Sequence, residues 1–136
     1  MVNFLAVLVS AIAMMVVGMA WYSKGLFGKA WMQYSKVNQK DIEKAKKSGS
    51  VNKSYLVAFI AALVTTYVLS MLIELTASSS AGSGALLGFW IWLGFLATTT
   101  IGSVIWEGKP VNLYWINTGQ QLVALVVAGL ILGAWV

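Results

Sequence analysis

Apolar residues along the chain fall into four long runs separated by polar segments. We place these runs at residues 4–22, 55–75, 85–106 and 113–135. An apolar run of about 20 residues is long enough to cross the hydrocarbon core of a bilayer as an α-helix. The pattern therefore predicts an all-α, multi-pass membrane protein with four transmembrane helices, and residues 1–136 form a single domain with no room for a second one.

The first run has a competing interpretation as a cleaved signal peptide. A signal peptide begins with a basic stretch, and here the apolar run is preceded only by Met-Val-Asn. The run is also long for a signal peptide and ends in Trp21-Tyr22, a pair typical of membrane interfaces. We therefore expect a retained transmembrane helix.

The only long polar segment is the loop 23–54, which holds eight of the nine lysines. Positively charged loops stay in the cytoplasm. The pattern predicts a cytoplasmic loop and both termini extracytoplasmic. A second interpretation of the same lysines is binding to anionic lipid.

Two short helices are expected within this loop. The first is amphipathic and suited to the membrane interface, because one helical face collects Leu26, Phe27, Ala30, Trp31 and Tyr34. The second is a solvated helix that begins after Asn38 and ends at Gly49, residue types favoured at the two ends of a helix.

The amino-acid composition excludes several kinds of functional site but does not identify one. Only 10% of residues are charged, and Cys and His are absent. Disulfides, thiol catalysis and zinc or copper sites built on these residues are excluded. We expect no cofactor, metal or catalytic residue. The net charge of +5 comes from the lysine loop, so it indicates membrane topology rather than nucleic-acid binding.

Hydrogen-bonding side chains gather where the third and fourth runs meet. Polar groups in hydrocarbon should face other helices or water. Helical spacing places Thr99, Ser103 and Glu107 on one face of the third span, and Asn117, Gln120 and Gln121 on one face of the fourth. Both sets lie within about 10 Å of the cytoplasmic ends of their helices, from the 1.5 Å rise per residue. They form either hydrogen bonds between packed helices or a polar pocket for binding or permeation.

Glycines spaced four residues apart mark the opposite halves of the same two spans. Gly84 and Gly88 open the third span, and Gly129 and Gly133 close the fourth. Small residues at this spacing allow helix backbones to approach closely. Either these glycines pack the hairpin against itself or one pair contacts another copy of the chain.

Aromatic residues occur where the proposed spans reach the membrane surface. We interpret these side chains as interface anchors, namely Trp21, Tyr22, Trp31, Trp106 and Trp115.

Several motifs in order resemble one known family. They are Gly18-Met-Ala-Trp-Tyr-Ser23, Leu26-Phe-Gly-Lys-Ala-Trp31, Gly94-Phe-Leu-Ala-Thr-Thr99, Glu107-Gly-Lys-Pro110, Ile116-Asn117 and Gly119. The chain resembles small bacterial membrane proteins grouped as domain of unknown function 1761. The resemblance implies a four-span protein of the bacterial inner membrane with no defined activity. Relatives often have proline at the position of Lys24 and Tyr-His at Gln120-Gln121, so a role for that histidine would not transfer.

Three functions remain open from the sequence. The first is a non-enzymatic, self-associating structural or regulatory module, with the lipid bilayer as its partner. The second is a small oligomeric carrier or channel for an ion or polar solute, lined by the polar residues of spans three and four. The third is an enzyme. It has the least support of the three, because only Glu107 and Lys109 could act as titratable groups at the cytoplasmic face.

Overall fold

A computed structural model describes residues 2–23, 25–36 and 38–135, and all regular elements within these ranges are helices. The all-α fold class is confirmed. Four stretches are long and apolar enough to cross a membrane: α1 (Phe4–Trp21), most of α4 (Ser50–Leu75), the continuous stretch Ala81–Ile105, and α8 (Val111–Ala134).

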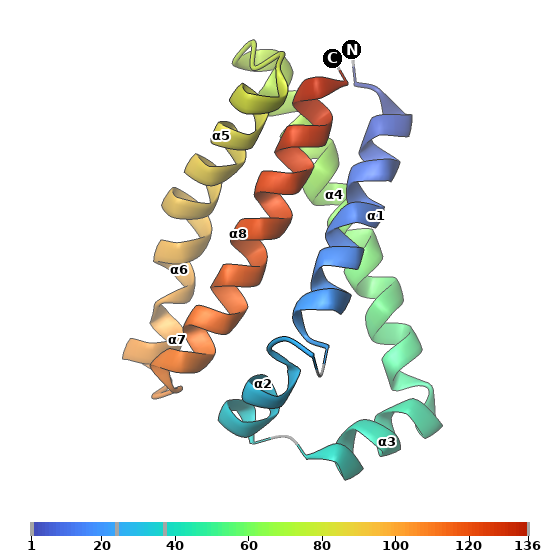
Figure 1. Ribbon diagram of the computed structural model, residues 1–136, viewed down its shortest axis with the longest axis vertical. Coiled ribbons are helices and arrows are strands. Elements are labelled where there is room, and N and C mark those ends of the chain that lie inside the picture. The colour runs from blue at the N-terminus through green and yellow to red at the C-terminus, as the bar shows by residue number, and fades with distance from the viewer. Residues whose placement is uncertain (1, 24, 37, 136) are drawn as a thin grey trace.

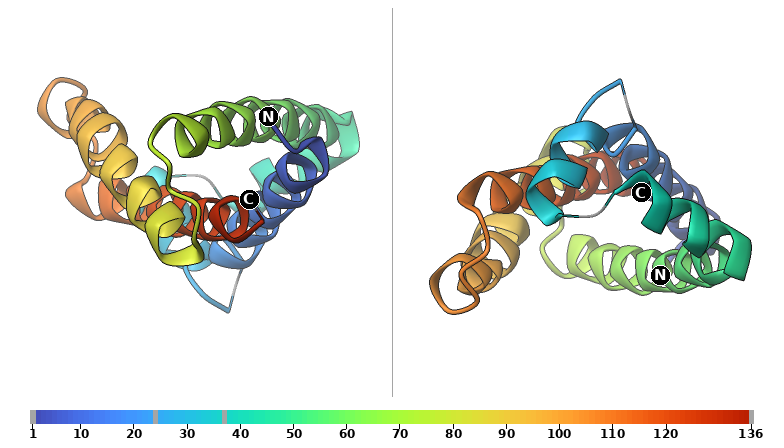
Figure 2. Two further views of the ribbon diagram at one scale, coloured as in Figure 1. Left: turned by 90° about the horizontal axis from the view of Figure 1, so that it is seen from above. Right: turned by 90° about the horizontal axis from the view of Figure 1, so that it is seen from below.

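The four long helices run roughly alongside one another, with both termini at one end (Figure 1). We call this the terminal end. The opposite end carries the short helices α2 (Gly28–Ser35) and α3 (Gln39–Ser48), and we call it the Lys-rich end. Helix α8 packs extensively against both α5 (Ala81–Ile91) and α1, whereas α4 and α5 touch only slightly. Figure 2 shows α4 diverging from the stretch Ala81–Ile105 toward the Lys-rich end.

The main apolar core lies toward the terminal end. Its buried members come from the start of α1, the last turns of α4 and the last turns of α8: Ala6, Val7, Leu69, Ile73, Ala128 and Leu132. Much of the outward face of α4 is exposed and apolar, including Val57, Val64 and Leu75. Such a surface suits contact with lipid tails, which is where a membrane helix can leave apolar side chains uncovered.

The two helices expected in the polar loop are both present. Asn38 caps α3, with its side chain accepting from the Asp41 backbone N–H at 2.9 Å, and Asp41 closes a capping box in return. Gly49 ends α3 in the left-handed region at φ 78°, a conformation that glycine adopts without a steric penalty. Helix α2 packs against α8, and Phe27, which directly precedes α2, stacks on the Trp21 ring at the end of α1 with 4.5 Å between centroids.

The third apolar run differs from a regular helix over residues 85–106. It begins earlier, at Ala81, because Ser80 caps it. It then passes through a π-helix, η1 (Trp92–Ala97), followed by the short helices α6 (Thr98–Thr100) and α7 (Gly102–Ile105). The threonine run contributes to this irregularity: the Thr98 hydroxyl donates to the Gly94 carbonyl at 2.8 Å, a contact type that often bends helices.

Candidate functional site

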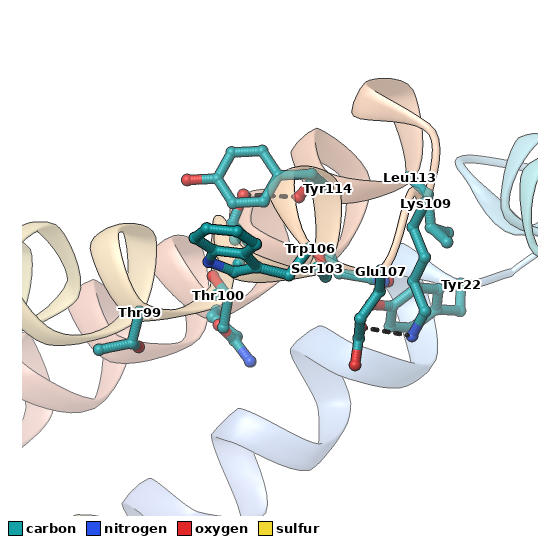
Figure 3. Close-up of a pocket in the computed structure, with 13 residues that line it drawn as sticks. Tyr22, Thr99, Thr100, Ser103, Trp106, Glu107, Lys109, Leu113 and Tyr114 are labelled. Carbon is teal, nitrogen blue, oxygen red and sulfur yellow. Dashed lines mark hydrogen bonds and ion pairs between the residues drawn. The ribbon is translucent and has the colours of Figure 1, made fainter.

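An open pocket of about 640 Å³ lies at the Lys-rich end, between the α6–α7 segment and the first turns of α8 (Figure 3). We call it the polar pocket. Its lining is rich in hydroxyl, amide and charged groups and consists of Tyr22, Thr99, Thr100, Gly102, Ser103, Trp106, Glu107, Lys109, Leu113, Tyr114, Asn117, Thr118 and Gln121.

The sequence-predicted polar residues mostly converge on this pocket. The pocket is lined by Thr99, Ser103 and Glu107 from the third run and by Asn117 and Gln121 from α8. Gln120 is the exception, because it does not line the polar pocket and instead lines a second cavity. Neighbouring residues on an α-helix point about 100° apart, so Gln120 lines only the second cavity, whereas Gln121 lines both.

The wall nearest α1 is held by two hydrogen bonds to α8. The Tyr22 hydroxyl donates to the Asn117 side-chain oxygen at 2.7 Å, and the Trp21 indole N–H donates to the Ile116 carbonyl at 2.8 Å. The sequence indicated interface anchoring for both aromatic residues and gave no signal for these bonds. Each ring thus joins α1 to α8, and Tyr22 brings its phenol into the pocket lining.

A second pair of aromatic donors joins the third run to α8. The Trp92 indole N–H donates to the Thr118 carbonyl at 2.7 Å, and the Tyr114 hydroxyl donates to the Ala97 carbonyl at 2.5 Å. Both bonds begin or end in η1. Short π-helical segments are frequent at functional sites, and here η1 immediately precedes the pocket residues Thr99 and Thr100 in the same span.

The turn between α7 and α8 supplies the charged rim of the pocket. The Lys109 ammonium lies 3.5 Å from a Glu107 carboxylate oxygen, with the Lys and Glu side chains 55% and 60% exposed. Gly108 adopts a φ of 69° and Pro110 precedes the first residue of α8, so the backbone turns sharply between the two charges. Figure 3 shows the two side chains side by side at the edge of the pocket.

Gln121 lies deeper in the bundle and is incompletely satisfied. Its side-chain oxygen is buried and has no hydrogen-bond partner among the described residues. A buried polar group without a partner costs about 1–3 kcal/mol. By contrast, the pocket hydroxyl of Thr118 already donates to the Tyr114 carbonyl at 2.7 Å.

A second cavity of about 730 Å³ adjoins the first and is mostly apolar. We call it the apolar groove. It runs between α1, α4 and α8, and Tyr22 and Gln121 line both cavities. The rest of its lining is Met14, Met15, Gly18, Met19, Tyr55, Ala58, Ala61, Ala62, Thr65, Leu96, Gln120, Ala124 and Leu125.

The glycine pairs meet each other at the terminal end. A Cβ placed on Gly84 would collide with the Gly129 carbonyl, one on Gly88 would lie 2.5 Å from the Leu125 carbonyl oxygen, and one on Gly133 would collide with Ser80. All four glycines therefore lie where the backbones of α5 and α8 nearly touch. We call this the glycine contact.

The other predicted anchors differ in exposure. Trp106 is 86% exposed and Trp115 is 60% exposed, whereas Trp31 is half-buried with its ring edge against Tyr22 at 6.0 Å. Their placement at a membrane surface stays a prediction.

The described residues contain no group of three acidic side chains that could hold a metal ion. The polar pocket offers hydrogen-bonding groups and one ion pair, which are the kinds of group that orient a ligand in a binding site.

Comparison with known proteins gives one match. The model of a family described as a protein of unknown function (DUF1761) matches residues 5–133. No curated protein matches the chain, and no solved structure does.

Proposed function

Because the chain belongs to DUF1761, a family of unknown function, no activity can be carried over, and we propose from the site that this membrane protein is a small carrier. It binds the polar part of its substrate in the polar pocket. The observation that carries the proposal is that polar residues from three helices line one open cavity.

The direction of access follows from charge. The lysines of α2 and α3 lie at the same end as the polar pocket, and the positive-inside rule assigns that end to the cytoplasm. In the proposed function, the substrate therefore enters the pocket from the cytoplasmic face of the bacterial inner membrane, passing the Glu107–Lys109 pair.

A non-enzymatic, self-associating module is the second candidate. The exposed apolar face of α4 favours it, because that face could pack against another copy of the chain. The glycine pairs give it no support, since all four glycines lie in the contact between α5 and α8 inside the chain. A single monomeric species across a wide range of concentrations in detergent would exclude this candidate.

Water access to the pocket tests the carrier directly. The chain has no native cysteine, so Ser103→Cys and Asn117→Cys can each be labelled with a membrane-impermeant thiol reagent in inside-out vesicles. We expect both to react. Lys47→Cys on exposed α3 is the positive control, and Ala128→Cys, in the fully buried core, is the negative control. Protection of both pocket cysteines while Lys47→Cys reacts would mean a dry helix contact and would overturn the proposal.

A further inference from the structure

The polar pocket and the apolar groove adjoin, because Tyr22 and Gln121 line both. We propose that they form one amphipathic site for a zwitterionic phospholipid with a primary ammonium in its head group. The head lies in the polar pocket and one acyl chain lies in the apolar groove. This inference rests on the proposed function and names its substrate class.

The charged rim matches the two charges of such a head group. Glu107 and Lys109 carry opposite charges within 3.5 Å of each other, and both side chains are more than half exposed. Their ion pair is weak because water competes with it. A ligand ammonium can bind the carboxylate while the ligand phosphate binds the lysine, and both contacts are charge-assisted hydrogen bonds.

The carboxylate at the rim favours an ammonium that carries N–H donors. The Glu107 side chain is 60% exposed, so a ligand can reach its carboxylate oxygens, which only accept hydrogen bonds. A primary ammonium supplies three donors, whereas a quaternary ammonium such as choline supplies none. The pocket chemistry therefore separates two head groups of equal charge.

The apolar groove suits an acyl chain. Alanines on α4, including Ala58 and Ala61, leave space opposite the methionines of α1. Methionine is unbranched and flexible, so it adapts to a chain of variable shape. Both cavity volumes fall in the range of about 300–1,000 Å³ that small-molecule sites occupy. Ala61 is exposed at the side of the bundle, so the groove opens toward the surrounding lipid.

Lipid retention by the full chain tests the inference. The purified protein in a neutral detergent is mixed with equal amounts of phosphatidylethanolamine and phosphatidylcholine that carry the same acyl chains. Native mass spectrometry then measures which lipid stays bound. We expect phosphatidylethanolamine to be retained at least about fivefold over phosphatidylcholine, which corresponds to a modest difference in binding free energy. Equal retention of the two lipids, or retention of neither, would overturn the inference.

Three variants locate the site. Ala61→Trp fills the groove and should abolish the retained lipid, whereas Val64→Trp, on the same helix, 60% exposed and outside the groove lining, should not. Glu107→Gln should remove the preference between head groups. Equal retention by the two tryptophan variants would place the lipid elsewhere. Cysteine labelling of the polar pocket is a separate readout. If the pocket cysteines react but the protein shows no preference between the two lipids, the proposed carrier function stands and only this substrate class is rejected.

Discussion

The two ends of the contact between α8 and the Ala81–Ile105 stretch are built in opposite ways. At the terminal end, four glycines bring the backbones together until no side chain fits between them. At the Lys-rich end, Trp92 and Tyr114 bridge the same two elements through hydrogen bonds to backbone carbonyls, and a cavity of about 640 Å³ separates them.

This difference shows how one pair of helices can be both tightly packed and open. Lipid tails are as apolar as the helices, so association in a membrane depends on close packing and hydrogen bonds. The glycines allow the close packing, and the long side chains of Trp92 and Tyr114 form the hydrogen bonds across a wider gap. The aromatic hydrogen bonds thus keep the walls of the cavity apart. We expect stability to depend mainly on the glycines and these aromatic residues, and binding on the polar side chains that line the cavity.

The largest loss of stability is expected in the glycine contact. Gly84→Ala places a methyl group against the Gly129 carbonyl, and such overpacking costs about 1–3 kcal/mol or more. Gly82→Ala is the matched control on α5, because a Cβ there meets nothing and should stabilise by about 0.4–1 kcal/mol. Thermal unfolding in detergent measures both. Equal stability of the two variants would contradict the close approach.

A smaller loss is expected when an aromatic bridge loses its donor. Trp21→Phe keeps a ring but removes the N–H bonded to the Ile116 carbonyl, which should cost about 0.5–1.5 kcal/mol. Trp115→Phe, at a side chain 60% exposed, should change the free energy of unfolding less. The bridge would be irrelevant to stability if both variants unfolded at the same temperature.

Replacing each of the two pocket amides is expected to change the free energy of unfolding in opposite directions. Gln121→Leu removes a buried oxygen that has no partner, so stability should stay equal or rise by up to about 1 kcal/mol. Asn117→Leu leaves the Tyr22 hydroxyl without its acceptor and should destabilise by about 1 kcal/mol. Denaturation curves of the two variants, compared with lipid retention by each, separate folding from binding. A large loss for Gln121→Leu would show a structural role.

The smallest effect on folding is expected at the charged rim. Both members of the Glu107–Lys109 pair are more than half exposed, so Glu107→Gln should change the free energy of unfolding by less than about 1 kcal/mol. Its effect should appear in ligand selectivity. Unfolding of Glu107→Gln at a temperature far below that of the native chain would show that the pair stabilises the turn.

Part of the fold and of the site was predictable from local pattern. Apolar run length located the four spans, and residue type located the ends of α3 at Asn38 and Gly49. Helical spacing brought Thr99, Ser103 and Glu107 to one cavity. These features depend only on neighbours in the sequence, where periodicity and capping preferences apply.

The rest depends on how each helix is rotated about its axis. A helix that is apolar on all sides carries little information on which face meets a partner, because lipid accepts every face. The sequence therefore did not separate Gln120 from Gln121, and it gave Trp21 an interfacial role without its bond to Ile116. The π-helix at Trp92–Ala97 was missed for a related reason: no single residue type specifies it.

The position of the glycine contact has a mechanical consequence. It brings α5 and α8 together near one end, and the span continues from Gly88 to Ile105, where hydrogen bonds of Trp92 and Tyr114 join it to α8 across a wider gap. At 1.5 Å per residue, this part of the span is roughly 25 Å long, so a tilt of about 5° at the glycines would move its far end by roughly 2 Å. A small tilt at the glycine contact would therefore change the width of the pocket mouth by far more than it would disturb the packing of the glycines.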